Sequence, residues 1–436
     1  MSTEESMPAA VQPIASSERI QAIDVLRGFA LLGILPVNMI AFAHVQSAYE
    51  NPAVAGGFTG VNYLSWLITH LIFENKMVTL FSMLFGVGLF IQVDRAEKKR
   101  GRVGSARGLY FRRVGWLLLF GLIHAYLFWY GDVLTYYALI GMLVYWLRRL
   151  SPRWLFAIGA ILLLIGTLAL VGSSVLIDMA VDYVKAHPER VEDVKDIEQM
   201  QAGFLPSPEL IERESKQVRD AGFLGLARLR FWSTLSFQAQ GFVAFVLWRF
   251  SGLMLFGIAL YKLGLFSLQW SNRVYWRWVF IGFGVGIPLT ILSVLEHQSL
   301  ANIAQMLRMM GTYDYYASLF MAAGYIGIIL LAMKNQWLPA LTKRMAAVGQ
   351  MAFTNYLTHT LICTAIFHGW GLAQFGLWPR YGLWLLAVTI WLMQLIVSPI
   401  WLKHFYFGPC EWVWRSLTYW KRQPMRRCNE TTLMTA

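Results

Sequence analysis

His124 and Asp132 are the residues of this chain whose types and spacing come closest to a catalytic pair. They lie in one of its most apolar stretches, "GLIHAYLFWYGDVLTYYAL" (121–139). Gly131 predicts a tight turn after which Asp132 caps the next helix, so the turn can fold the two side chains toward each other. A carboxylate fixes the tautomer of a neighbouring imidazole and raises its basicity, as acid–base catalysis requires. The same pair also fits a hydrogen-bonded histidine packed between helices.

A second candidate base lies in "GQMAFTNYLTHTLICTAIFHGWG" (349–371). Asn355 and His359 are four residues apart and therefore share one face of a helix. This spacing fits a histidine base, polar contacts between helices, or two ligands of a metal ion. Because no HExxH motif and no third ligand accompany the pair, we predict no metal site.

A polar stripe follows the segment "RIQAIDVLRGFALLGILPVNMI" (19–40). Asp24 and Arg27 are three residues apart and can pair on one helix face. Asn38 returns to that face three turns later, about 16 Å along the axis. The stripe fits either a binding site for an anionic substrate or an ion pair that only orients the helix at the membrane surface.

Glu74, Asn75 and Lys76 interrupt another apolar segment, "HLIFENKMVTLFSMLFGVGLF" (70–90). The residues indicate an amphipathic approach to a membrane span rather than a site. The pattern leaves open whether 66–92 is one helix or a re-entrant piece followed by a span.

The elements that position these residues are membrane helices. The chain has 436 residues, of which 57% are hydrophobic and only 14% are charged, against about 25% charged residues in soluble domains. About 20 apolar residues cross the hydrocarbon layer as a helix. The sequence therefore predicts an all-α, polytopic membrane protein with about ten transmembrane helices, at residues 21–43, 66–92, 111–129, 132–148, 153–177, 240–262, 277–296, 314–333, 345–368 and 380–402.

Basic residues in the connecting loops give the orientation. Residues 94–113 hold eight Lys/Arg and two acidic residues, which indicates a cytoplasmic loop. Counting spans from this loop places the other basic loops and the tail "KRQPMRR" (421–427) on the same side, so both termini are predicted to be cytoplasmic. Residues 178–239, with 11 of the 24 acidic residues, then lie outside. The net charge of +13 thus indicates membrane topology rather than nucleic-acid binding.

The three cysteines form no CxxC or Cys/His cluster, so neither disulfides nor a zinc site are expected. The first twenty residues lack the apolar core of a signal peptide, and the first span is expected to remain as an anchor. The predicted organisation has five parts: a disordered cytoplasmic N-terminus (1–20), an N-terminal bundle (21–177), an external helical loop (178–239), a C-terminal bundle (240–402) and a basic, aromatic cytoplasmic tail (403–436).

The tail segment "FGPCEWVWRSLTYWKRQPMRR" (407–427) combines aromatic and basic residues. This composition is typical of a helix that lies on a membrane surface. We therefore expect anionic lipid of the cytoplasmic face as a partner, together with a small-molecule substrate, and the sequence also allows a homodimer.

Several segments together resemble the YeiB-like family of bacterial inner-membrane proteins, which is built on a domain of unknown function. The resemblance covers nearly the whole chain, and the WYGD and FGPxEWxWRxLTY runs are its most specific parts. The matching runs are "DVLRGFALLGILPVN" (24–38), "LFSMLFGVGL" (80–89), "GLIHAYLFWYGDVLTYYAL" (121–139), "GQMAFTNYLTH" (349–359) and "FGPCEWVWRSLTY" (407–419). The resemblance implies a bacterial inner-membrane location.

The "LRG" element of the first span is also similar to that of transmembrane acyltransferases such as heparan-α-glucosaminide N-acetyltransferase. Those enzymes pass an acyl group from cytosolic acyl-CoA to an acceptor across the membrane. The similarity implies acyl-CoA as a co-substrate, with no tightly bound cofactor. It also implies a catalytic histidine after the first span, where His44 is the candidate.

Two sets of roles follow for an acyltransferase. His124 or His359 would be the base, with Asp132 orienting His124. Arg27 would hold a phosphate of the donor, with Asp24 orienting it, and Asn38 and Asn355 could donate hydrogen bonds to the thioester oxygen. A small-solute transporter could use the same residues as a path, although the chain shows no inverted repeat. A structural or signalling membrane protein is the third function that the sequence allows.

Overall fold

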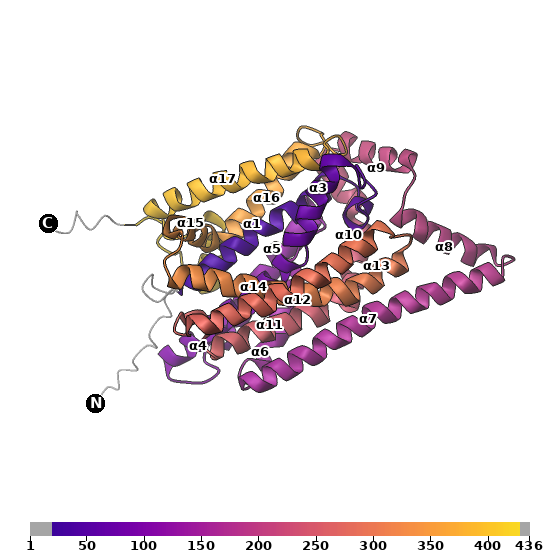
Figure 1. The fold of residues 1–436 in the computed structure, drawn as a ribbon. Coiled ribbons are helices and arrows are strands. Elements are labelled where there is room, and N and C mark those ends of the chain that lie inside the picture. Colours follow the sequence, from indigo (N-terminus) through magenta and orange to yellow (C-terminus); the bar gives the residue numbers. More distant parts are fainter. Residues whose placement is uncertain (1–19, 428–436) are drawn as a thin grey trace, which may run out of the picture.

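The structure, a computed structural model, describes residues 20–427, and these residues are almost entirely helical (Figure 1). The exception to helix and loop in this range is an isolated antiparallel bridge between Phe405 and Arg426. The predicted disordered N-terminus (1–20) and the last nine residues, 428–436, lie outside the described residues, apart from Ile20. The all-α prediction is confirmed.

Eight helical segments are long and apolar enough to cross a membrane within the described residues. Each predicted span matches one of these segments or one of two shorter helices, α6 (Leu134–Leu147) and α16 (Ala352–Phe367). The long segments are α1 (Gln21–Ala43), α3–η2–α4 (Gly60–Ile68, Thr69–Phe73, Lys76–Arg100), α5–η3 (Arg107–Ile123, His124–Phe128), α7 (Pro152–Ala186), α10–η4–α11 (Phe223–Gly241, Phe242–Val246, Leu247–Lys262), α12 (Asn272–Gln298), α13–η6–α14 (Ile303–Met309, Met310–Asp314, Tyr315–Lys334) and α17 (Arg380–His404).

The remaining elements connect or cover these helices. They are α2 (Ser47–Glu50), α8 (Val191–Phe204), α9 (Pro208–Asp220), η5 (Leu265–Ser267), α15 (Pro339–Gln350) and α18 (Pro409–Tyr419). Helices α8 and α9 lie at one end of the bundle, which we call the cap end (Figure 1). The start of α1 lies with α15 and α18 at the opposite end, which we call the tail end.

Two predicted boundaries differ from the structure. Helix α7 has 35 residues, or about 52 Å at 1.5 Å per residue, so it extends well past a hydrocarbon layer of about 30 Å. Likewise α10 begins at Phe223, inside the segment predicted as an external loop. The predicted segment 66–92 is broken at Asn75, whose φ of 59° places it in the left-handed region between η2 and α4.

Helix α1 is the centre of the bundle. Within the described structure, 78% of its most apolar window is buried, against 28% for α7 and for α17, which therefore face the lipid. Helices α1 and α15 cross closely because glycines meet there. A Cβ added at Gly28 would lie 2.0 Å from the carbonyl oxygen of Met345, and one at Gly349 would lie 1.9 Å from that of Asp24. Small residues of this kind let membrane helices approach.

Candidate functional site

A cavity of about 230 Å³ opens at the tail end of the bundle. Residues of α1, α4, α5, α6, α16 and α18 line it, so it lies between both halves of the chain. Four arginines and two acidic residues face this cavity, which gives it a net positive charge; they are Arg27, Arg95, Arg113, Arg415, Asp24 and Glu411. We call it the arginine cavity.

Arg113 has hydrogen-bonding capacity that no described residue uses. Its guanidinium carbon lies 3.7 Å from the centre of the Trp414 ring. Its Nε and Nη1 atoms are buried and find no hydrogen-bond partner in the described structure. Arg27, by contrast, donates to the carboxylate of Asp24 at 3.3 Å. Because buried guanidinium nitrogens without hydrogen-bond partners are unfavourable, Arg113 is well suited to bind an anion that enters the cavity.

Helix α18 closes one wall of this cavity. Glu411 accepts hydrogen bonds from the backbone N–H groups of Phe353 (2.7 Å) and Thr354 (3.1 Å), and from the Thr354 hydroxyl (2.5 Å). Burial raises the pKa of the Glu411 carboxyl, and these hydrogen bonds oppose that shift. The indole N–H of Trp414 donates to the carbonyl of Arg113. The tail predicted to lie on the membrane surface thus includes a helix that caps the start of α16 and packs on α5.

His124 and Asp132 lie together inside the bundle, and neither lines the arginine cavity. The Nδ1 atom of His124 lies 2.9 Å from Asp132 Oδ1, and Asp132 Oδ2 accepts from the backbone N–H of Thr135 at 2.8 Å, as the expected helix cap does. Both side chains are buried. His124 begins the π-helical turn η3, a local geometry that occurs often at functional sites.

The structure adds a hydroxyl that the sequence did not indicate. The Nε2 atom of His124 lies 2.9 Å from Oγ1 of Thr360 on α16. With Nδ1–H donating to Asp132, Nε2 accepts from the Thr360 hydroxyl. A hydroxyl, an imidazole and a buried carboxylate in this order are the groups that activate a hydroxyl for nucleophilic attack.

Tyr356 separates this group from the arginine cavity. Its ring lines the cavity and also lies 5.3 Å, centre to centre, from the ring of His124. Val133 and Leu134, directly after Asp132, line the same inner end. A ligand whose charged group lies among the arginines could therefore reach His124 only if Tyr356 turned aside.

The other predicted site residues lie elsewhere. The Asn355 amide donates to the Val348 carbonyl and to Ser398, both at 3.1 Å. His359 bonds Gln394 through Nε2 at 3.0 Å, and its buried Nδ1 has no partner among the described residues. The Asn355–His359 pair thus forms polar contacts between α16 and α17, and both N–H groups of the asparagine are already engaged.

Asn38 and His44 lie toward the cap end of α1. Asn38 lines none of the cavities described for residues 20–427. His44 follows the last residue of α1, is buried, and its Nε2 lies 2.9 Å from the Trp378 carbonyl oxygen. The structure therefore brings Asp24, Arg27, His124 and Asp132 to one region and leaves Asn38, His44, Asn355 and His359 outside it.

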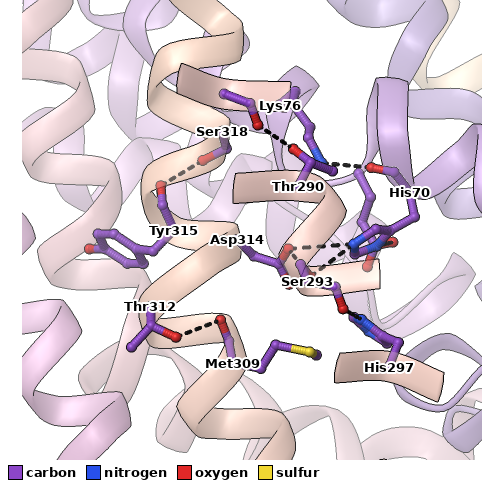
Figure 2. A network of polar contacts seen from close by, with 12 residues as sticks. His70, Lys76, Thr290, Ser293, His297, Met309, Thr312, Asp314, Tyr315 and Ser318 are labelled. Carbon is purple, nitrogen blue, oxygen red and sulfur yellow. Dashed lines mark hydrogen bonds and ion pairs between the residues drawn. The ribbon is translucent and has the colours of Figure 1, made fainter. Parts of the chain in front are cut away.

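A second buried polar cluster lies between η2, α4, α12 and η6 (Figure 2). It includes Glu74 and Lys76, which the sequence indicated as an amphipathic approach; Lys76 is fully buried and donates to the carbonyl of His70 at 2.6 Å. That interpretation was therefore wrong for Lys76. Of the four π-helical turns in residues 20–427, one holds His70 and another ends at Asp314, so each polar cluster contains π-helical turns.

Sequence signals for the missed residues were weak. Arg95 and Arg113 belong to the basic loop that indicated orientation, and Arg415 lies in the specific FGPxEWxWRxLTY run. Thr360 follows His359, but the two side chains contact different helices. Thr360 contacts His124 of η3, and His359 contacts Gln394 of α17. Asp314 is the first residue of a predicted span, and an acidic residue at the end of a span does not indicate a site.

The chain matches a family model at residues 260–421, described as "Protein of unknown function (DUF418)". It is 32% identical over 410 residues to the uncharacterized protein YeiB of Escherichia coli (strain K12), covering 92% of this chain and 96% of that protein. The uncharacterized protein YxaH of Bacillus subtilis (strain 168) is 27% identical over 432 residues, covering 96% and 99%. No solved structure matches the chain.

Proposed function

The chain belongs to the family of YeiB, and its residues 260–421 match the DUF418 model. We propose from its site that it is a membrane-bound acyltransferase that uses a cytosolic acyl-CoA-type donor. One observation carries the proposal. An arginine-lined cavity at one end of the bundle and a Thr360–His124–Asp132 group lie on opposite sides of Tyr356. The multi-pass helical fold and the bacterial relatives fit the bacterial inner membrane.

The donor would bind with its phosphates at the mouth of the arginine cavity. Arg113 offers two nitrogen atoms without a hydrogen-bond partner, and Arg27 is held by Asp24. Guanidinium groups match phosphate oxygens because they donate from two positions at once. A cavity of about 230 Å³ has room for the narrow thioester arm but not for the nucleotide, which would stay at the tail end.

Once the Tyr356 ring turns aside, His124 would act as the base. Its Nε2 would accept the proton of an acceptor hydroxyl while that oxygen bonds to the thioester carbon. The Thr360 hydroxyl, which lies 2.9 Å from Nε2, would give way to this acceptor hydroxyl. When the carbon–sulfur bond breaks, the departing thiolate takes the proton back from Nε2. Asp132 keeps the Nδ1 proton in place and stabilises the imidazolium.

Binding of acetyl-CoA to the purified protein in detergent tests the donor site. Arg113→Ala removes the unpaired guanidinium, and loss of a charged hydrogen bond costs about 1.5–3 kcal/mol, so we expect affinity to fall by about 10- to 100-fold. Arg273→Ala is the matched control, because Arg273 is an exposed basic residue that does not line the cavity.

Equal affinities of wild type and Arg113→Ala would refute the donor site. Competition by inorganic phosphate as strong as that by acetyl-CoA would instead identify a simple anion site. Binding of ATP but not acetyl-CoA would also contradict the proposal.

Solute transport is the second candidate, because α1 lines a cavity at each end. Ile23, Arg27 and Ile34 face the arginine cavity, whereas Pro36 and Ile40 face a smaller cavity toward the cap end. Proteoliposomes loaded with a labelled acceptor decide between the two functions. Acyl transfer leaves the acceptor on its side of the membrane in modified form, and transport moves it across unchanged.

A further inference from the structure

The second polar cluster is centred on His70, which no part of the proposed acyl transfer uses. His70 lies in η2 and its side chain is completely buried. Figure 2 shows it facing Ser293 of α12 and Asp314 of η6, with Lys76 of α4 beside it. A cluster of ionisable side chains at this depth is costly, and ion pathways and proton relays in membrane proteins are built from such residues.

Four residues form a continuous hydrogen-bonded chain through this cluster. Glu74 Oε2 lies 2.8 Å from His70 Nδ1, and His70 Nε2 lies 3.0 Å from Ser293 Oγ. The Ser293 hydroxyl in turn lies 2.6 Å from Asp314 Oδ1. We call this series, Glu74–His70–Ser293–Asp314, the His70 chain.

The His70 chain needs one more proton than its neutral side chains supply. Each of its three hydrogen bonds requires a hydrogen between the two heavy atoms. Ser293 brings one and a neutral imidazole brings one, so with both carboxyl groups ionised one bond would have none. Two lone pairs would then face each other in a buried place at 3.0 Å or less, which is strongly unfavourable.

The additional proton can occupy either end of the chain, or the His70 imidazole between them, whose two N–H groups then donate to Glu74 and Ser293. With Glu74 protonated, the carboxyl donates to Nδ1, Nε2–H donates to Ser293, and Ser293 donates to Asp314. With Asp314 protonated, every one of these bonds points the other way. If each hydrogen crosses its own hydrogen bond, the state with Glu74 protonated becomes the state with Asp314 protonated. No atom other than hydrogen has to move far.

The two ends have different surroundings. The side chain of Glu74 is 21% exposed and lines the small cavity toward the cap end, whose volume of about 40 Å³ admits water. The side chain of Asp314 is 4% exposed and lies inside the bundle. No three His, Cys, Asp or Glu residues in the described structure are arranged to hold a metal ion, so the proton is the cation that this chemistry fits.

We propose that the His70 chain is a proton wire that carries a proton between the cap-end cavity at Glu74 and the buried Asp314. The proton enters from water on the Glu74 carboxyl, and a hydrogen leaves Ser293 for Asp314 in the same shift. Other charged or titratable groups stand around the chain on every packed element, and they offset the two carboxylates; they are Lys76 of α4, Arg249 of α11, His297 of α12 and Arg380 of α17. The wire is independent of the proposed acyl transfer.

Charge displacement tests the wire directly. The protein is reconstituted in liposomes adsorbed on a solid-supported membrane, and the bath pH is stepped without any substrate. Because the proton moves inward from Glu74, wild type should give a transient current. Ser293→Ala removes the middle hydroxyl and should reduce the displaced charge at least tenfold, whereas Ser293→Thr keeps a hydroxyl and should retain most of it.

Ser318→Ala is the matched control. The Ser318 hydroxyl is buried and accepts a hydrogen bond from Arg249 at 2.7 Å, but it is not part of the His70 chain. The isosteric changes Glu74→Gln and Asp314→Asn should abolish the current, and they carry the test if Ser293→Ala does not fold. A wild-type current in folded Ser293→Ala or Asp314→Asn, or an equal loss in Ser318→Ala, would overturn the proposal.

Discussion

Polar side chains inside this bundle form clusters, and the clusters differ in the types of residue that contact one another. An isolated charge at the centre of a membrane helix costs about 2.5–3.5 kcal/mol on insertion scales. His124 contacts a carboxylate and a hydroxyl, and His70 contacts one carboxylate directly and a second through a serine. Arg113 is the contrast, because two of its buried nitrogens have no described partner. The difference suggests proton chemistry at the histidines and ligand binding at the arginine.

At this scale we expect His124 and Asp132 to act as one unit. His124→Ala and Asp132→Asn should each reduce acyl transfer at least a hundredfold, because general acid–base catalysis contributes about 10²–10⁴-fold. The double mutant should be no slower than His124→Ala alone, since Asp132 works through the imidazole. Transfer rates of purified variants with acetyl-CoA measure this.

The same variants should still bind acetyl-CoA, because the arginine cavity remains intact. Losses that multiply in the double mutant would indicate two separate roles. Full activity in His124→Ala would exclude it as the base.

Among elements, the crossing of α1 and α15 positions the arginine cavity. Gly28, the residue after Arg27, lies against the backbone of Met345, and Gly349 lies against the carbonyl of Asp24. The α18 helix closes the same cavity through Glu411. The arginine cavity is therefore assembled from helices that begin or end at the tail end, and its shape depends on how closely they approach.

Gly28→Ala should therefore destabilise the bundle. Its new methyl would stand 2.0 Å from the Met345 carbonyl oxygen, so α1 and α15 must move apart; overpacking of this kind costs about 1–3 kcal/mol. Gly115→Ala in α5 is the matched control, since no atom lies within 4 Å of its Cβ position. Thermal unfolding in detergent compares the two, and an unchanged midpoint for Gly28→Ala would contradict the packing argument.

For the whole molecule, the structure separates a tail end with the arginine cavity from a cap end with α8, α9 and the small cavity (Figure 1). An acyl-CoA-type donor is cytosolic, so the tail end must face the cytoplasm if the proposed function is correct. The basic loops that the sequence places on that side agree with this orientation.

Reporter fusions test the orientation. A reporter after Met425 should read as cytoplasmic, and one inserted near Gln201 in α8 should read as external. The opposite result at either position would place the arginine cavity on the side without acyl-CoA. It would thereby exclude the proposed donor while leaving the proton wire intact.

The sequence by itself determined what depends on neighbours along the chain. Runs of about 20 apolar residues marked the long helices. The three-residue spacing of Asp24 and Arg27 predicted their pairing, and the turn before Asp132 brought it to His124. Such contacts follow from helix periodicity or from one short turn, so no knowledge of the packing is needed.

Only the tertiary structure decided which distant residues meet. Thr360 reaches His124 across 236 positions, and Ser293 reaches His70 across 223. Apolar helices can pack side by side in many orders and rotations at similar cost, since lipid and protein interiors are about equally apolar. The order chosen here depends on close contacts such as Gly28 against Met345, and those contacts exist only once the whole bundle is assembled.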